Sequence, residues 1–358
     1  MKENTTVIGA GIVGASIAYH LAKRGADVTI IDRTGIAAGA TGKSFAWINA
    51  HHTENEAYHR LRYQSIAEFH RLDRELEGGL GLSWCGALSF DVLGEAFDRR
   101  AERFRALGYP ADVISHNRFN ELEPRYGHPP GRALHLSLEA AVNPAHASEA
   151  LIEGAVRNGA RTMFGAEIMA VLKDGGRVTG VETSYGSLAT SQVVVAAGTG
   201  AEAILESVDV SLPMANRPGV MLHSRPVPKV LNHLIWGDRI HLKQQPDGRL
   251  VIGEIFSDGR NDLDPGMIAE QMLVDARRHL PDVDVQIDRT TIGLRPIPKD
   301  GMPVIGTVSS VPGLYVAVMH SGVTLAPIVG RMAADELLDD ITFPTLNPYR
   351  PERFSRKA

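Results

Sequence analysis

The sequence predicts an α/β fold in which two domains are interleaved along the chain, the second built on a mixed, largely antiparallel sheet. Three observations predict it. Residues 5–32 have the pattern of a strand, a glycine turn, a helix and a second strand. The alternation of strands and helices stops after Asp32, and the apolar–polar alternation of strands returns near residue 167, so the chain is expected to leave the first domain and re-enter it. Residues 213–254 have the pattern of β-hairpins, in which strand-like segments flank turn residues, and this favours a separate antiparallel layer.

The first unit carries a specific glycine pattern. A β-branched run at residues 5–8 leads into GAGIVG at residues 9–14, and SIAYHLAKRG follows with helical spacing of its apolar residues and a stop at Gly25. The second strand, DVTII, ends at Asp32, 21 residues after Gly11. A strand, glycine turn, helix and terminal acid in this register are typical of a Rossmann-like nucleotide-binding domain.

Each position in that pattern has a predicted task. Gly9 allows the tight turn, Gly11 lets the backbone approach a pyrophosphate at the helix N-terminus, and Gly14 allows the helix to pack on the strand. Asp32 is expected to bind a ribose hydroxyl pair, which disfavours a 2′-phosphate, although Arg33 lies beside it. The pattern leaves NAD and FAD open as the nucleotide.

The remaining elements follow from periodicity and turn residues. TENE at residues 53–56 has the form of a capping box and precedes a helix with a core-facing stripe that reaches Leu76. In the first half of the chain we also predict strands at 84–92, 167–172, 177–183 and 192–198, and helices at 96–107 and 144–158. In the second half we predict a hairpin turn at 246–248, a helix at 265–280, a strand at 313–319 and a helix from about Gly322.

Composition limits the classes of function. The 358 residues carry a formal charge of -5, and no run of Lys or Arg exceeds two, so a nucleic-acid partner is not expected. A single cysteine, Cys85, excludes an internal disulfide and suits a reducing compartment, which makes the cytoplasm the expected location. No segment approaches the roughly 18 apolar residues of a membrane span. The adjacent His51 and His52 lack spaced carboxylate partners, and no metal site is expected.

One arginine stands out near the C-terminal end. In GLRPIPKDGMPVIG, residues 293–306, Arg295 lies between apolar residues and a proline. Burying it there requires an anionic partner, and its planar fork suits a carboxylate. That partner is either a substrate carboxylate or an Asp or Glu of the protein, and a solvated strand end is the third reading.

Six segments together resemble a known family: VIGAGIVG with Asp32, AAGATGKS, GRVTGVETSYGSLATSQVVVAAG, DGRLVIGE, GLRPIPKDGMPVIG and HSGVTLAP. In this order the chain resembles the FAD-dependent D-amino-acid oxidase superfamily, and most of all its glycine oxidase and sarcosine oxidase branch. The resemblance implies an FAD-binding domain at 1–80, 142–212 and 290–358, and a substrate domain at 81–141 and 213–289. It also implies oxidation of the C–N bond of a small amino acid or N-substituted glycine, by hydride transfer from the amine carbon to flavin N5 and hydrolysis of the resulting imine.

The resemblance assigns roles to individual residues. It makes Arg295 the clamp for the substrate carboxylate, places Trp47 beside the isoalloxazine, and places His241 and His320 in or near the pocket. The cofactor-binding positions that it implies, beside Gly9, Gly11, Gly14 and Asp32, are Val13, Arg33, Ala40, Thr41, Lys43, Ser44, Phe45, Ile168, Ala197, Gly198, Gly293, Gly322, Val323 and Thr324. The helix that begins near Gly322 is expected to direct its N-terminus at the flavin pyrimidine edge.

Several features depart from the family pattern or stay open. No cysteine lies near the GLRP segment, and Lys43 stands where relatives with covalent flavin have a histidine, so we expect non-covalent FAD. Val251 aligns with a lysine that assists oxygen activation in sarcosine oxidases. Arg217 and Lys243 are read as either a second polar contact for substrate or exposed residues. The electron acceptor is O2 or another molecule, and a homo-oligomer is possible. The alternatives are a nicotinamide-linked dehydrogenase and a non-catalytic flavin redox sensor.

Overall fold

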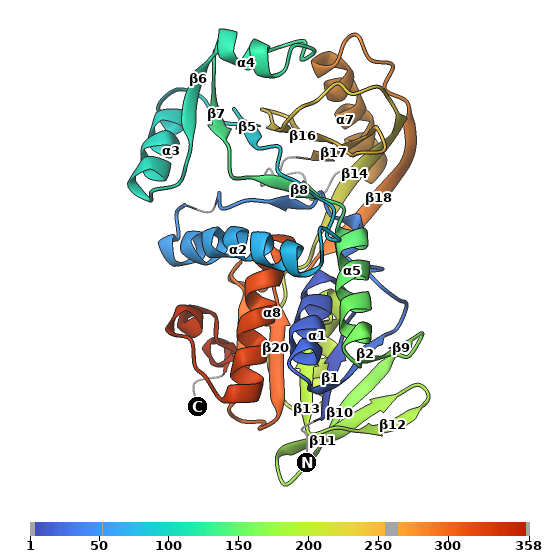
Figure 1. Cartoon of the computed structure of the whole chain (residues 1–358). Helices are drawn as coiled ribbons and strands as arrows, with labels where there is room; N and C mark the ends of the chain where they lie inside the picture. Colours follow the sequence, from blue (N-terminus) through green and yellow to red (C-terminus); the bar gives the residue numbers. More distant parts are fainter. Residues whose placement is uncertain (1–3, 52, 255–263, 356–358) are drawn as a thin grey trace.

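The computed structural model of the chain describes residues 4–51, 53–254 and 264–355. These residues form two stacked blocks, each built on one large sheet (Figure 1). The colours of Figure 1 show that segments from the beginning, middle and end of the chain meet in the lower block, and that the segments between them form the upper block. The predicted α/β class with an interleaved, mixed-sheet second domain is confirmed.

The lower block is built on a six-stranded sheet. Its strands, in spatial order, are β19 (Val304–Thr307), β20 (Leu314–Val318), β13 (Gln192–Val195), β1 (Asn4–Ile8), β2 (Asp27–Asp32) and β9 (Arg161–Phe164). All neighbours pair in parallel except β19 and β20. The apolar side chains of these strands therefore alternate between two covered faces.

Helices cover one face of this sheet and a small meander covers the other. The helical face carries α1 (Ile12–Lys23), α5 (Pro144–Arg157) and α8 (Gly322–Asp339), which pack side by side (Figure 1). The opposite face packs against the antiparallel strands β10 (Ile168–Asp174), β11 (Arg177–Thr183) and β12 (Gly186–Ala189), and against α6 (Ala201–Glu206). Val194 faces the helices, while Val193 and Val195 face the meander.

The upper block is built on an eight-stranded mixed sheet. Its strands, in spatial order, are β18 (Ile287–Arg295), β14 (Arg217–Pro226), β17 (Arg249–Glu254), β16 (Ile240–Gln244), β15 (Leu234–Trp236), β5 (Ala87–Ser89), β7 (Arg132–Leu136) and β6 (Asp112–Ser115). Only β15 and β5 pair in parallel. The helices α7 (Pro265–His279) and α4 (His116–Leu122) pack on one face, and α3 (Gly94–Ala106) contributes to the core that continues into the lower block.

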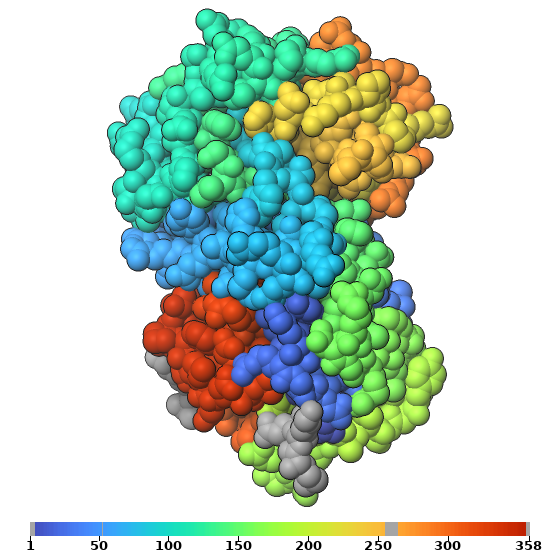
Figure 2. Space-filling view, in the orientation of Figure 1, coloured from blue at the N-terminus to red at the C-terminus, as the bar shows by residue number. Residues whose placement is uncertain are grey.

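A long helix and a small sheet lie where the blocks meet. The helix α2 (Glu56–Glu75) crosses the middle of the molecule, and the space-filling view shows it as a light-blue belt between the blocks (Figure 2). The small sheet has the order β3 (Trp47–Ile48), β8 (Ala140–Val142) and β4 (Leu82–Ser83). Among the described residues, no helix is long and apolar enough to cross a membrane.

Most predicted elements are found within a few residues of their expected bounds, but the capping box is wrong. The helix α2 begins at Glu56, and its N-cap is Asn55, whose side chain accepts a hydrogen bond from the Tyr58 backbone N–H at 3.0 Å. Asn is as good an N-cap as Thr, and it lies directly before the helix. The domain boundaries stay a prediction, and β18 spans the one drawn at residue 290.

Candidate functional site

A cavity of about 480 Å³ lies against the carboxyl ends of β1, β2 and β13 and reaches the ends of β17 and β18. It brings together every sequence-predicted site residue except Gly14 and His241. The predicted residues that line it are Gly9, Gly11, Val13, Asp32, Arg33, Ala40, Thr41, Lys43, Ser44, Phe45, Trp47, Ile168, Ala197, Gly198, Gly293, Arg295, His320, Gly322, Val323 and Thr324. Residues from across the whole sequence therefore share one cavity.

The glycine turn before α1 is close-packed. Gly9 has a φ of 108°, and a Cβ added there would lie 2.5 Å from the Ala196 carbonyl oxygen. A Cβ added to Gly14 would lie 2.0 Å from the Gly9 oxygen, so Gly14 supports the turn from behind rather than lining the cavity. Gly11 is the N-cap of α1 and provides no side-chain cap, which leaves the first turn of the helix facing the cavity.

Asp32 and Thr41 organise the backbone around that turn. The Asp32 carboxylate accepts hydrogen bonds from the backbone N–H groups of Ala10 at 2.9 Å, Thr34 at 2.8 Å and Gly35 at 2.9 Å. The Thr41 hydroxyl accepts one from the Ile12 N–H at 3.2 Å. A carboxylate has about four acceptor positions, so the predicted ribose contact would use the remaining capacity of Asp32.

The N-terminus of α8 lies on the same cavity. Ser321 is its N-cap and provides no side-chain hydrogen bond, and Gly322 packs so closely on Val13 that an added Cβ would lie 3.1 Å from its Cγ2. The Thr324 hydroxyl donates to the Trp47 carbonyl at 3.2 Å and ties the helix to β3. Two helix N-termini, from α1 and α8, thus open onto one cavity, where their N–H groups favour negative charge.

Arg295 lies at the end of β18 and is paired with a carboxylate of the protein. Its Nη2 donates to Glu254 Oε1 at 2.7 Å, and the side chains are only 17% and 12% exposed. Burial lowers the pKa of Arg295 below its usual value, and the Glu254 carboxylate counteracts part of this effect. Both side chains line the cavity. Of the alternatives left open by the sequence, the described structure therefore has a protein carboxylate beside Arg295.

His241 lies behind the cavity wall, in an aromatic cluster. Its ring centroid is 5.6 Å from that of Phe45, 5.8 Å from that of Trp47 and 5.3 Å from that of Trp236. Burial lowers the pKa of His241 to about 3, so the ring is neutral at neutral pH. His241 is buried and does not line the cavity, and sequence alone could not show this because it does not give side-chain depth.

The three remaining polar candidates, His320, Arg217 and Lys243, differ in their exposure to solvent. His320 is exposed and lines the cavity, and Arg217 is exposed and pairs in register with Arg295 across β14 and β18. Lys243 is not exposed. It is 3% accessible, donates to the Val142 carbonyl at 3.0 Å and lies 5.3 Å from the Phe45 ring centre. Burial lowers the pKa of Lys243 to about 7.

His51 belongs to a buried polar pair rather than to a pair of histidines. Its Nε2 lies 2.7 Å from Oε1 of the fully buried Glu139, which also accepts a hydrogen bond from the Tyr109 hydroxyl at 2.9 Å. His52 lies outside the described residues. Cys85 is half-buried and does not line the cavity, and non-covalent cofactor binding stays a prediction.

Sequence reasoning missed three charged residues of the cavity, namely Glu254, Arg62 and Glu167. Glu254 was read only as the end of a hairpin strand. Arg62, on α2, is 7% exposed and donates from Nε to the Asn49 carbonyl at 3.1 Å, and its guanidinium also contacts the Asn49 side chain. A charged residue ending an apolar strand was the available signal for Glu254, whereas Arg62 was hidden in a helix rich in charged residues.

The cavity fits a dinucleotide. Side chains at Gly9 or Gly293, which both line the cavity, would collide with the Ala196 backbone or with Lys43, so these glycines allow the close backbone packing that forms the cavity wall. Two helix N-termini face the cavity, as a pyrophosphate and a second anionic centre require.

Comparison with known proteins supports the same reading. The family described as FAD dependent oxidoreductase matches residues 4–336. An uncharacterized oxidoreductase of Bacillus subtilis is 29% identical and is matched over 96% of this chain and 97% of its own. The glycine oxidase of Bacillus licheniformis is 26% identical, over 98% of each chain. The crystal structure of glycine oxidase from Geobacillus kaustophilus has the same fold, with a TM-score of 0.88 at 24% identity, and the match covers 98% of this chain and 99% of that one.

Proposed function

Because this chain belongs to the FAD dependent oxidoreductase family, we propose that it oxidises the C–N bond of a small amino acid or N-substituted glycine and holds the substrate carboxylate with Arg295. The protein is an FAD-dependent enzyme of the amino acid oxidase type. The proposal adds the substrate class and the residues that bind substrate and cofactor.

The residues around the two helix N-termini would hold FAD. Gly9, Gly11 and the first turn of α1 would receive the pyrophosphate, and Asp32 the ribose. Gly322 and the first turn of α8 would stabilise negative charge on the flavin pyrimidine. Bound FAD supplies a two-electron acceptor that takes a hydride from the carbon bearing the amine.

The position of Arg295 carries the substrate assignment. Its guanidinium lies across Gly219, because a Cβ added to Gly219 would lie 2.5 Å from Nη2 and 2.6 Å from Nε. It occupies the wall of the same cavity as the two helix N-termini. A planar, permanently charged fork on a rigid strand end suits a carboxylate, and it would orient the amine carbon with little ordering cost.

The alternatives are less well supported. A nicotinamide-linked dehydrogenase does not fit the family, whose cofactor is FAD. A non-catalytic flavin sensor has no need of a buried arginine beside the cofactor cavity, whereas an amino acid enzyme does. The amino acid reading is also the one given by the name of the glycine oxidase relative.

The test is anaerobic mixing of the purified, FAD-loaded protein with glycine, sarcosine, proline and D- and L-amino acids, followed by flavin absorbance near ~450 nm. We expect one class of amine to bleach the flavin. In Arg295→Ala the second-order rate constant of this reduction should fall by roughly 10²- to 10³-fold, the usual cost of removing one partner of a buried charged contact.

The same experiment can overturn the proposal. A flavin that no amine in the panel reduces would contradict the amino acid assignment. Reduction that proceeds equally well in Arg295→Ala would retain the reaction class and remove the carboxylate clamp.

A further inference from the structure

The Arg295–Glu254 pair is built by the topology of the upper sheet. Glu254 is the last residue of β17 and Arg295 is the last residue of β18, and β14 lies between these strands. Gly219 and Val220 of β14 separate the two side chains. Gly219 gives the guanidinium room to cross the strand, and the Val220 N–H donates to Glu254 Oε1 at 3.2 Å. The pair is therefore held by rigid backbone at the cavity wall.

This pairing changes what the cavity offers a ligand. An arginine alone would attract any anion, but Glu254 places a negative charge 2.7 Å from it. A simple carboxylate that reaches Arg295 must compete with Glu254, and it leaves that carboxylate close to its own negative charge in a mostly buried site. A zwitterion brings one charge of each sign and matches both members of the pair.

Glu254 has capacity for a second contact. Its Oε1 takes the hydrogen bonds from Arg295 and Val220, whereas Oε2 accepts none from a described residue. The side chain lines the cavity, so this oxygen is available to an ammonium group bound there.

We propose that Glu254 and Arg295 recognise the substrate together as a zwitterion, with the substrate carboxylate on the Arg295 guanidinium and its ammonium group on Glu254. Glu254 is then the residue that selects amino acids over carboxylic acids of the same shape. This inference rests on the proposed function, because it takes Arg295 as the carboxylate site. The ammonium group loses its proton after the substrate has bound and before the hydride is removed.

The test measures binding in FAD-loaded protein whose flavin is kept reduced under argon, so that no ligand is oxidised. Calorimetric titration compares pairs in which a carbon replaces the nitrogen: glycine with propionate, sarcosine with butanoate, and proline with cyclopentanecarboxylate. We expect wild-type protein to bind at least one amino acid roughly tenfold or more tightly than its partner, as a charged hydrogen bond of about 1.5–3 kcal/mol implies.

Glu254→Gln should reverse this preference. Without the competing charge, the carboxylic acids should bind more tightly than to wild type, while the amino acids bind more weakly. Glu68→Gln is the matched control, because it removes the same charge from an arginine-bound glutamate on α2 that does not line the cavity. It should leave the preference unchanged. A merely structural role for Glu254 would weaken both ligand classes together.

Each failure has its own signature. Equal binding of amino acids and their carbon analogues by wild-type protein would overturn the inference without any variant, even if Glu254→Gln failed to fold. Reduction of the flavin by an amino acid, combined with an unchanged preference in Glu254→Gln, would overturn the inference and leave the proposed function intact. Absence of flavin reduction by every amine would instead count against the proposed function.

Discussion

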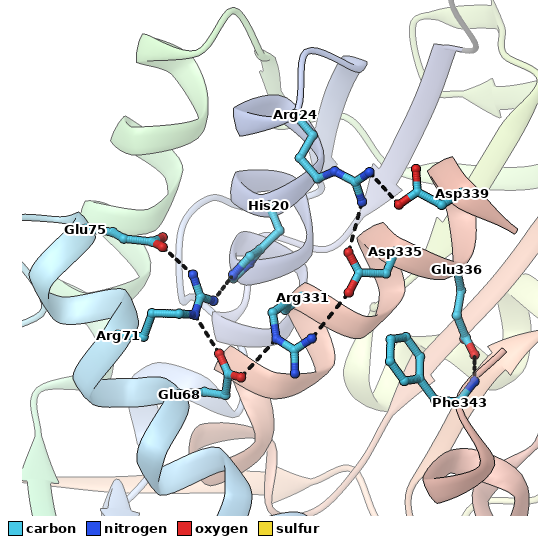
Figure 3. A network of polar contacts seen from close by, with 10 residues as sticks. All are labelled: His20, Arg24, Glu68, Arg71, Glu75, Arg331, Asp335, Glu336, Asp339 and Phe343. Atoms are coloured by element: carbon cyan, nitrogen blue, oxygen red, sulfur yellow. Dashed lines mark hydrogen bonds and ion pairs between the residues drawn. The ribbon is translucent and has the colours of Figure 1, made fainter. Parts of the chain in front are cut away.

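Two arginine–carboxylate assemblies in this protein differ in how they are built. Between α1, α2 and α8, arginines and carboxylates form a continuous network (Figure 3). Arg71 donates to Glu68 at 2.7 Å and to the Glu75 carboxylate, and Arg331 donates to the other oxygen of Glu68 at 2.9 Å. At the cavity, Arg295 and Glu254 are joined by one side-chain hydrogen bond of 2.7 Å.

The difference indicates what each assembly can do. In the network, Glu68 bridges two arginines on different helices, so breaking one contact leaves charges with unsatisfied partners. In the cavity pair, Glu254 Oε2 accepts no hydrogen bond from a described residue and the cavity adjoins both side chains. A multiply bonded network holds helices together, whereas two side chains that share one hydrogen bond beside a cavity can exchange that contact for a ligand.

The largest expected effect comes from α1, which joins the two regions. Its first turn lines the cavity, its last turns carry His20, and its C-cap is Arg24, both residues of the network. Gly14→Ala would force a Cβ to within 2.0 Å of the Gly9 oxygen. We expect a loss of about 3 kcal/mol in the free energy of unfolding and loss of bound FAD.

Urea unfolding and the flavin-to-protein absorbance ratio measure both effects. Gly131→Ala is the control, because an added Cβ there meets nothing within 4 Å. A Gly14→Ala protein with normal FAD content and stability would show that the turn is less rigid than described.

Arg331→Ala tests the network by itself. It removes the contacts to Glu68 at 2.9 Å and to Asp335 at 3.3 Å. Because Arg331 is one-third exposed, we expect a loss of about 1–2 kcal/mol in the free energy of unfolding. Flavin reduction should stay within about twofold of wild type, since Arg331 does not line the cavity. Slowing comparable to that in Arg295→Ala would erase the distinction between the two assemblies.

His20 gives the network a pH dependence. It is 5% exposed, its Nδ1–H donates to the Ser16 carbonyl at 2.8 Å, and Arg71 lies 3.0 Å from Nε2. Burial, with a smaller contribution from the Arg71 guanidinium, lowers the pKa of His20 to about 4. The unfolded chain takes up this proton near pH 6.5, so the contribution to stability is complete above that pH and is lost as the pH falls toward 4.

Comparison with His20→Gln isolates this contribution. Between pH 6.5 and 4.5, wild-type protein should lose roughly 2 kcal/mol more of its unfolding free energy than the variant does. Urea titrations at several pH values measure the difference. Parallel pH curves for the two proteins would contradict a neutral, buried His20.

Local signals allowed much of this structure to be predicted. The turn at Gly9 and Gly14 depends on contacts within one strand–turn–helix unit, so its sequence pattern specified its geometry. Arg295 was identified because its apolar neighbours made burial without a partner costly. Its partner could not be identified, because Glu254 reaches it only through β14, a strand whose place between β17 and β18 is a long-range property of the sheet.

Burial depth was the second limit. Lys243 and His241 alternate with Leu242 along β16, a pattern that normally leaves one face in water. Both faces of β16 are covered here, and all three residues are buried. The capping residue of α2 was also missed, since Thr53 and Asn55 are both good N-caps and only the backbone path selects between them.

The most direct measurement is a crystal structure of the FAD-loaded, anaerobically reduced protein with the amino acid that bleaches its flavin. We expect the ligand carboxylate within about 3 Å of the Arg295 guanidinium, its nitrogen at a similar distance from Glu254, and the contacts of Arg71 and Arg331 unchanged. An intact Arg295–Glu254 contact, with the ligand carboxylate held elsewhere, would contradict this expectation.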